Sequence, residues 1–98
     1  MKQYTVDEVK VMLESKKLIN ILDVREAEEV AKGKIPGVIH IPLGLLEFRL
    51  QDLNKSKEYI VVCRSGGRSG SAVQLLESRG YQVVNMVGGM LEWQGEIE

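Results

Sequence analysis

One short segment combines the chain's only cysteine with two glycines and two arginines, Cys63-Arg64-Ser65-Gly66-Gly67-Arg68-Ser69. A thiolate is a strong nucleophile, and adjacent glycines allow backbone angles that other residues avoid, so the segment can curl tightly. A curled segment ahead of a helix points several backbone N–H groups into one space, which attracts anions. The pattern therefore indicates a nucleophilic sulfur in an anion-binding loop.

The charges around Cys63 favour its ionised form. Arg64 and Arg68 lie within the loop, and no carboxylate occurs between Glu58 and Glu77. A free thiol has a pKa of about 8.5, which helix termini and cationic neighbours lower to roughly 3.5–7.5. We therefore expect a lowered pKa for Cys63. The alternative is a small buried hydrophobic residue, but such a cysteine needs neither the paired glycines nor the arginines.

A strand and a helix must position this loop. Residues 59–63 form an uninterrupted apolar run, which predicts a strand covered on both faces. The loop follows, and then a helix whose inward residues are Ala72, Leu75 and Leu76, ended by Gly80. Ligands of parallel sheets bind beyond the carboxyl ends of the strands, where this cysteine lies.

The remaining segments repeat the same alternation. Thr5 and Glu8 fit a capping box, which predicts a helix from residue 6 to about residue 15. Further strands are expected at 18–23, 38–41 and 82–87, and further helices at 26–32, at 43–53 and after 88–89. Alternating strands and helices predict an α/β fold, with a parallel sheet and helices on both faces.

Composition excludes several classes of protein. The 98 residues are 44% hydrophobic and carry a net charge of −1, which fits one globular domain over 1–98 and excludes a strongly basic nucleic-acid coat. One cysteine excludes an internal disulfide and cysteine-rich zinc sites, and we expect no metal or cofactor. No secretion signal and no membrane-spanning run of about 20 residues is visible, so we expect a cytoplasmic protein.

Four motifs, in order, resemble those of single-domain rhodaneses, a family of sulfurtransferases. The loop from Cys63 to Arg68 is similar to their active-site loop, and the other three similar segments are 23–26, 33–42 and 88–93. The resemblance covers nearly the whole chain. It implies a small α/β domain with a parallel sheet of about five strands flanked by helices.

The resemblance also implies a reaction. Cys63 would take a sulfane sulfur from thiosulfate or a persulfide donor, and a thiophilic acceptor, cyanide or a cellular thiol, would remove it. The loop amides would hold the anionic persulfide. The implied partners are a small-molecule donor and acceptor or a protein thiol, with neither nucleic acid nor membrane, and we expect a monomer. The alternative is a sulfur-relay or partner-binding module with little small-molecule turnover.

We expect one catalytic residue, five substrate-binding residues and three supporting residues. Arg64 either steers anionic donors or is merely solvated, and Arg68 fixes the loop and adds positive potential. Asp23 braces the loop or pairs with an arginine, and Arg25 reaches the substrate or pairs with an acid. The three groups are catalytic Cys63, then Arg64, Ser65, Gly66, Gly67 and Arg68, then Asp23, Arg25 and Ser69.

Two details refine the resemblance. Lys34, Val38 and Gly67 depart from the residues common in the family, and Gly67 loosens the loop without removing the nucleophile. Phosphatases of related fold have one residue more between cysteine and arginine than the four between Cys63 and Arg68. The shorter loop makes a smaller ring of donors, which suits a terminal sulfur better than a tetrahedral phosphate.

Overall fold

A single parallel sheet forms the centre of the computed structural model, which describes residues 1–98. Its five strands are arranged in the order β1-β5-β4-β2-β3, and every neighbouring pair is parallel. The strands are β1 (Gln3–Thr5), β2 (Asn20–Asp23), β3 (Ile39–His40), β4 (Glu58–Val62) and β5 (Gln82–Val87).

Helices connect these strands. Their bounds are α1 (Val6–Glu14), α2 (Ala27–Ala31), α3 (Leu43–Leu46), the 3-10 helix η1 (Glu47–Asp52), α4 (Gly67–Ser78) and the 3-10 helix η2 (Met90–Glu92). None of them combines the length with the apolar composition that crossing a membrane requires.

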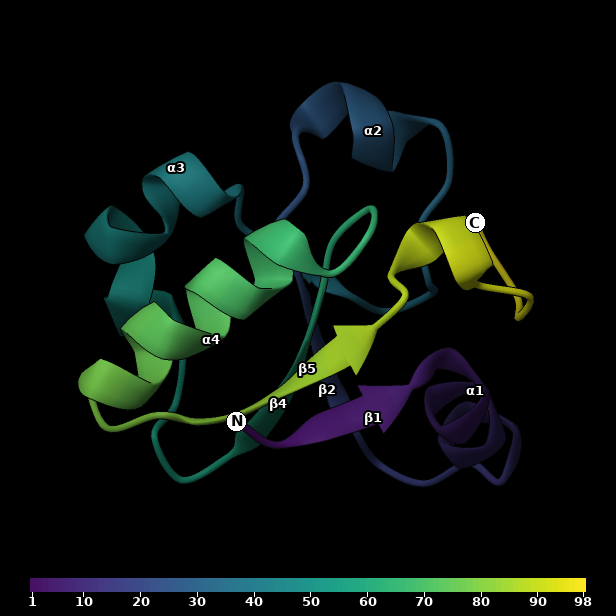
Figure 1. Cartoon of the computed structure of the whole chain (residues 1–98), viewed down its shortest axis with the longest axis horizontal. Helices are drawn as coiled ribbons and strands as arrows, with labels where there is room; N and C mark the ends of the chain where they lie inside the picture. Colours follow the sequence, from purple (N-terminus) through teal and green to yellow (C-terminus); the bar gives the residue numbers. More distant parts are fainter.

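The sheet separates two apolar clusters. One contains side chains of β4 together with Leu46 of α3 and Leu76 of α4, while the other contains β4 side chains together with Val9 of α1. Figure 1 accordingly shows α4 and α1 on different sides of the sheet, with α2 beyond one end of it. Successive side chains of a strand point to opposite faces, so β4 contributes side chains to both clusters and is buried from Tyr59 to Val62.

The α/β class, the parallel sheet and its flanking helices are confirmed, and so are several local details. Thr5 and Glu8 form the predicted capping box at α1, and β5 has the predicted bounds. Strand β1 was not predicted, because its three residues run directly into the cap of α1. Strand β2 starts only at Asn20, since Leu18 is 99% exposed and lies outside the sheet.

The segment after β3 differs from the single helix that its leucine spacing predicts. It splits into α3 and η1, and Arg49 inside η1 has a non-helical φ of −124°. The predicted inward leucines still pack on the core: Leu46 and Leu53 are buried, and Leu43 and Leu50 contact the same cluster. Periodic apolar spacing thus identified the buried face, although not the type of helix.

Candidate active site

The sulfur of Cys63 lies immediately beyond the carboxyl end of β4, at the start of the loop that leads into α4. Cys63 has no exposed surface. The backbone N–H of Gly66 donates to its Sγ at 3.0 Å, and Ser69 Oγ lies 3.4 Å from the same atom. Gly66 caps α4 with a φ of +107°, a left-handed conformation that favours glycine and turns its N–H back toward the sulfur.

Two opposing effects set the ionisation of Cys63. Burial raises the pKa of the thiol, because a charged sulfur loses its hydration. Hydrogen bonds from the Ser69 hydroxyl and from the backbone N–H groups of Ser69, Gly66 and Ser65 lower the pKa, and together they outweigh burial. The pKa of Cys63 therefore lies below its ordinary value, as the loop sequence predicts, although backbone and hydroxyl dipoles rather than arginine charges are the main cause.

Ser69 connects the sulfur to a buried polar network. Its hydroxyl lies within hydrogen-bond distance of the Gly66 carbonyl at 3.1 Å and also donates to Asn85 Oδ1 in β5. Asn85 Nδ2 donates to the same Gly66 carbonyl at 3.4 Å. The neutral thiol donates to Ser69 Oγ while the hydroxyl proton points to Asn85 Oδ1, and after ionisation that single proton turns from Asn85 to the sulfur. Asn85 thus holds both Ser69 and the turn at Gly66 in place.

Arg68 pairs with a carboxylate of α2. Its guanidinium donates to both carboxylate oxygens of Glu29, at 2.6 and 2.8 Å. The Arg68 hydrogen bond lowers the pKa of Glu29 to about 2, and Glu29 in turn raises the pKa of Arg68. The pair connects the first turn of α4 to α2 and so fixes the position of the loop between them.

A second ion pair lies under the loop at the end of β2. Arg25 donates to the carboxylate of the fully buried Asp23, with Nη2 to Oδ2 at 2.8 Å, and also to the Gly33 carbonyl at 2.9 Å. His40 Nε2 lies 2.7 Å from the Arg25 carbonyl, so this histidine contacts the backbone next to the ion pair. Of the two alternatives for Asp23, the structure contains the pairing with arginine.

The segment after β5 contacts the loop through backbone hydrogen bonds. Met90 N–H donates to the Cys63 carbonyl at 2.8 Å, and Leu91 N–H donates to the Arg64 carbonyl at 2.9 Å. Gly89 makes this approach possible, because a Cβ there would lie 2.5 Å from the Arg64 carbonyl oxygen. The backbone after Gly89 therefore holds the loop directly, and the lack of a side chain at Gly89 permits this contact.

A cleft opens beside the loop, at the carboxyl edge of the sheet. It has a volume of about 360 Å³ and is lined by polar residues from α2 and the loop and by apolar residues from the carboxyl-terminal segment. Figure 1 shows the loop after β4 between α2 and this segment. The lining residues are Arg25, Glu29, Lys32, Gly33, Arg64, Met90, Leu91, Trp93 and Ile97.

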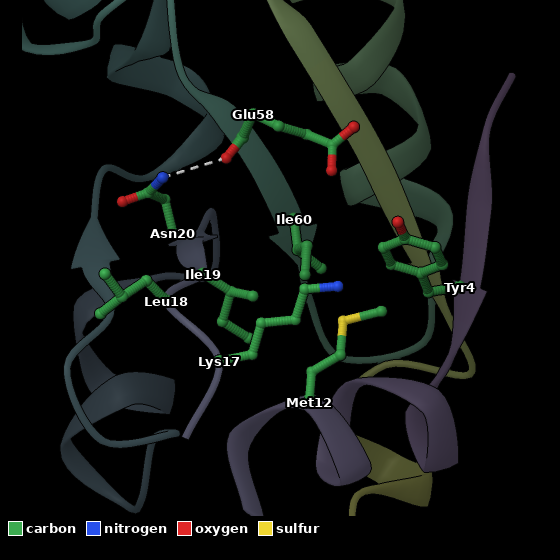
Figure 2. Close-up of a pocket in the computed structure, with 8 residues that line it drawn as sticks. All are labelled: Tyr4, Met12, Lys17, Leu18, Ile19, Asn20, Glu58 and Ile60. Carbon is green, nitrogen blue, oxygen red and sulfur yellow. Dashed lines mark hydrogen bonds between the residues drawn. The ribbon is translucent and has the colours of Figure 1, made fainter. Parts of the chain in front are cut away.

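A smaller cavity of about 170 Å³ lies at the opposite edge, where β2 and β4 begin. Figure 2 shows Lys17 extending its amine into this cavity near Tyr4, Met12 and Ile60. The chain's only cysteine is not among the residues that line it and lies instead at the carboxyl edge of the sheet. No group of three His, Cys, Asp or Glu side chains that could hold a metal ion occurs.

The structure brings together only part of the expected set. Cys63, Gly66 and Ser69 are in direct contact, and Ser65 contributes its amide. Arg64 and Arg25 line the cleft, whereas Gly67 is exposed at the start of α4.

Two important residues were not predicted. Glu29 is one of them, because the sequence does not show that Arg68 is the arginine that faces α2. Asn85 left a signal in the sequence, since it is a lone polar residue within the apolar run from Val83 to Val87. A buried amide in such a strand needs hydrogen-bond partners, and here they are Ser69 and the turn at Gly66.

Known proteins are similar to this chain in sequence and fold. The chain matches the Rhodanese-like domain family over residues 5–96. It is 40% identical over 97 residues to "Putative sulfurtransferase YtwF" of Bacillus subtilis, a match that covers 99% of this chain and 94% of that protein. The crystal structure of a rhodanese-like domain protein from Staphylococcus aureus has a TM-score of 0.94 at 41% identity, covering 100% of this chain and 97% of that one.

A further relative is longer than this chain. "Putative sulfur carrier protein YrkF" of Bacillus subtilis is 42% identical over 97 residues, which cover 98% of this chain and 52% of that protein. This chain therefore spans about half the length of that relative.

Replacing Ser69 tests how the sulfur is ionised. Ser69→Ala removes the hydroxyl that donates to the thiolate, so we expect a higher pKa for Cys63. It also leaves Asn85 Oδ1 without its donor, at a cost of about 1–3 kcal/mol in stability. Thiolate absorbance in the ultraviolet, followed against pH, measures the pKa. Ser78→Ala, on the exposed end of α4, should leave the titration unchanged; equal curves for Ser69→Ala and wild type would contradict the role of Ser69.

The Glu29–Arg68 pair predicts a pH dependence of stability. The folded-state pKa of Glu29, about 2, lies below its ordinary 4.5, so the stabilisation is complete above pH 4.5 and is lost as pH falls toward 2. Because the pair is partly exposed, we expect Glu29→Gln to cost about 1 kcal/mol at neutral pH. Melting temperatures of the two proteins should converge on acidification, whereas exposed Glu28→Gln should track wild type throughout. A constant gap between Glu29→Gln and wild type would rule out this role.

Gly89 and Gly37 form a matched pair for testing the contact behind the loop. Both have positive φ, but only a Cβ at Gly89 meets backbone, while a Cβ at Gly37 meets nothing within 4 Å. We expect Gly37→Ala to cost about 1–2 kcal/mol for its backbone conformation. Gly89→Ala should cost about 1–3 kcal/mol more, because the loop carbonyls must move. Urea unfolding measures both, and equal losses would show that the close approach of Gly89 to the loop is unimportant.

Proposed function

Because the chain belongs to the rhodanese-like domain family, we propose that it is a sulfurtransferase that works through a persulfide on Cys63. The observation that carries this proposal is the set of hydrogen-bond donors around one buried sulfur, with Gly66 N–H at 3.0 Å. These donors stabilise negative charge on sulfur, which both a thiolate and a persulfide carry. The relatives named as a sulfurtransferase and a sulfur carrier agree with this chemistry.

The proposed first step consumes a sulfane-sulfur donor such as thiosulfate. The Cys63 thiolate attacks the terminal sulfur of thiosulfate, a new S–S bond forms, and the old S–S bond breaks as sulfite leaves with its electron pair. The loop amides and Ser69 then face the persulfide. In the second step an acceptor, cyanide or a cellular thiol, attacks the outer sulfur and returns Cys63 to the thiolate.

The burial of Cys63 restricts which groups reach it. The residue has no exposed surface, so a donor must present a slender, terminal sulfur atom. An S–S bond of about 2.05 Å moves the reactive atom outward in the persulfide, nearer to an acceptor. These features favour a terminal sulfur over a bulkier phosphate group.

The remaining residues have supporting roles in this proposal. Arg64 lines the entrance and attracts anionic substrates, and Arg68 fixes the loop through Glu29. The Asp23–Arg25 pair holds the end of β2 beneath the site.

We also propose that residues 1–98 act as one monomeric domain in the cytoplasm. Their radius of gyration of 12.1 Å supports a compact unit, since about 13 Å is typical of 100 residues.

A second candidate function is a sulfur relay to a partner protein. The relative named as a sulfur carrier favours it, because that protein joins a similar sequence to further chain. The two functions differ in their acceptors. Slow thiocyanate production combined with rapid sulfur exchange to a protein thiol would favour the relay.

Intact-protein mass spectrometry after thiosulfate treatment tests the persulfide. Wild type should gain the mass of one sulfur atom and lose it again on addition of cyanide. Cys63→Ser should gain none, since the chain has a single cysteine. The protein is reduced beforehand and freed of reductant before thiosulfate is added. An unmodified wild-type mass after this treatment would contradict the proposed function.

A further inference from the structure

The cleft beside the loop is larger than an inorganic sulfur donor requires. Its volume of about 360 Å³ falls in the lower part of the roughly 300–1,000 Å³ range of sites for organic ligands. Thiosulfate is a small dianion with no organic portion, so it would leave most of the cleft empty. The size therefore indicates that one partner in the exchange is an organic molecule.

The charges lining the cleft favour an anion. Arg25 and Glu29 also line it, but each is neutralised by an ion pair. Lys32 and Arg64 are exposed and take part in no ion pair. They come from different elements, the end of α2 and the segment after β4, so a ligand between these elements would meet uncompensated positive charge.

The rest of the lining is apolar. Met90, Leu91, Trp93 and Ile97 contribute to it, and Leu91 and Ile97 are 61% and 57% exposed. Covering exposed hydrocarbon with an apolar ligand removes it from water, which favours binding. The cleft thus combines unpaired positive charge with an uncovered apolar surface next to the residue that follows Cys63.

We propose that this cleft binds the sulfur acceptor, a low-molecular-weight thiol with an anionic group and an apolar chain. Lys32 and Arg64 bind the anion, and Leu91 and Ile97 contact the chain. The acceptor thiol attacks the outer sulfur of the anionic Cys63 persulfide, and the acceptor's proton moves to the transferred sulfur in the product. The S–S bond to Cys63 breaks, its electron pair restores the thiolate, and no oxidant or reductant is consumed. This inference rests on the proposed sulfur transfer.

Binding can be measured without turnover, because Trp93 lines the cleft and is the only tryptophan in the chain. The fluorescence of Cys63→Ser protein would be titrated with mercaptohexanoate and with mercaptohexanol, which has the same chain but no charge. We expect mercaptohexanoate to bind about tenfold more tightly. This preference should shrink as salt is added, since both cations are exposed.

Variants separate the two parts of the cleft. Lys32→Gln and Arg64→Gln should each reduce the tenfold preference for mercaptohexanoate over mercaptohexanol to about threefold. Leu91→Ala should weaken both thiols to a similar degree and leave the preference unchanged. Lys17→Gln is the matched control, because this exposed lysine lines the cavity at the other edge of the sheet (Figure 2). Lys17→Gln should leave the affinities of the Cys63→Ser protein for both thiols unchanged.

The outcomes distinguish this inference from the proposed function. Three results would each overturn the inference. The first is equal affinity for the two thiols, and the second is the absence of any change in Trp93 fluorescence. The third is that Lys17→Gln lowers the preference for mercaptohexanoate as much as Lys32→Gln does. Persulfide formation is measured independently, by the mass of the wild-type protein. Selective thiol binding without a gain of sulfur would therefore refute the sulfur transfer, whereas a gain of sulfur without thiol preference would refute only the acceptor assignment.

Discussion

Ionising a buried sulfur atom is the central physical problem of this site. Removal from water favours the neutral thiol of Cys63, and only groups aimed directly at the sulfur can reverse that preference. The Gly66 N–H does so from 3.0 Å because this residue has a left-handed backbone conformation where α4 begins. A residue with a Cβ adopts this conformation only at a cost, so the ionisation of the sulfur depends on a glycine.

Three contacts from separate parts of the chain keep this turn in place. Asn85 in β5 contacts the Gly66 carbonyl and Ser69, Glu29 in α2 pairs with Arg68, and the backbone after Gly89 holds the Cys63 carbonyl. Adjacent parallel strands bring the ends of β2, β4 and β5 to one edge of the sheet, which places these contacts around the loop. The fold therefore supports the site from three directions, and only the Glu29–Arg68 pair among these contacts is partly exposed.

How much of this could be predicted from the sequence depends on the distance between the interacting residues. Local signals were reliable: the capping box at Thr5, the apolar run of β4 and the glycines before α4 each produced the expected element. Contacts between residues far apart in the chain could not be predicted in the same way. Nothing in the local sequence shows that Glu29 faces Arg68, thirty-nine residues away, because that depends on how α2 is placed over the loop. The division of residues 43–53 into α3 and η1 was missed for a similar reason, since periodicity records burial and not helix type.

The cations near the site divide into two groups with different physical effects. Arg25 and Arg68 are each paired with a carboxylate, so their fields largely cancel and they act mainly as structural links. Arg64 and Lys32 are unpaired and exposed, so their charge acts on whatever enters the cleft. Neutral backbone dipoles and a hydroxyl stabilise the charge on the sulfur instead. Because those dipoles belong to the folded loop, they surround Cys63 before any anion approaches, and a change at Lys32 would leave them in place.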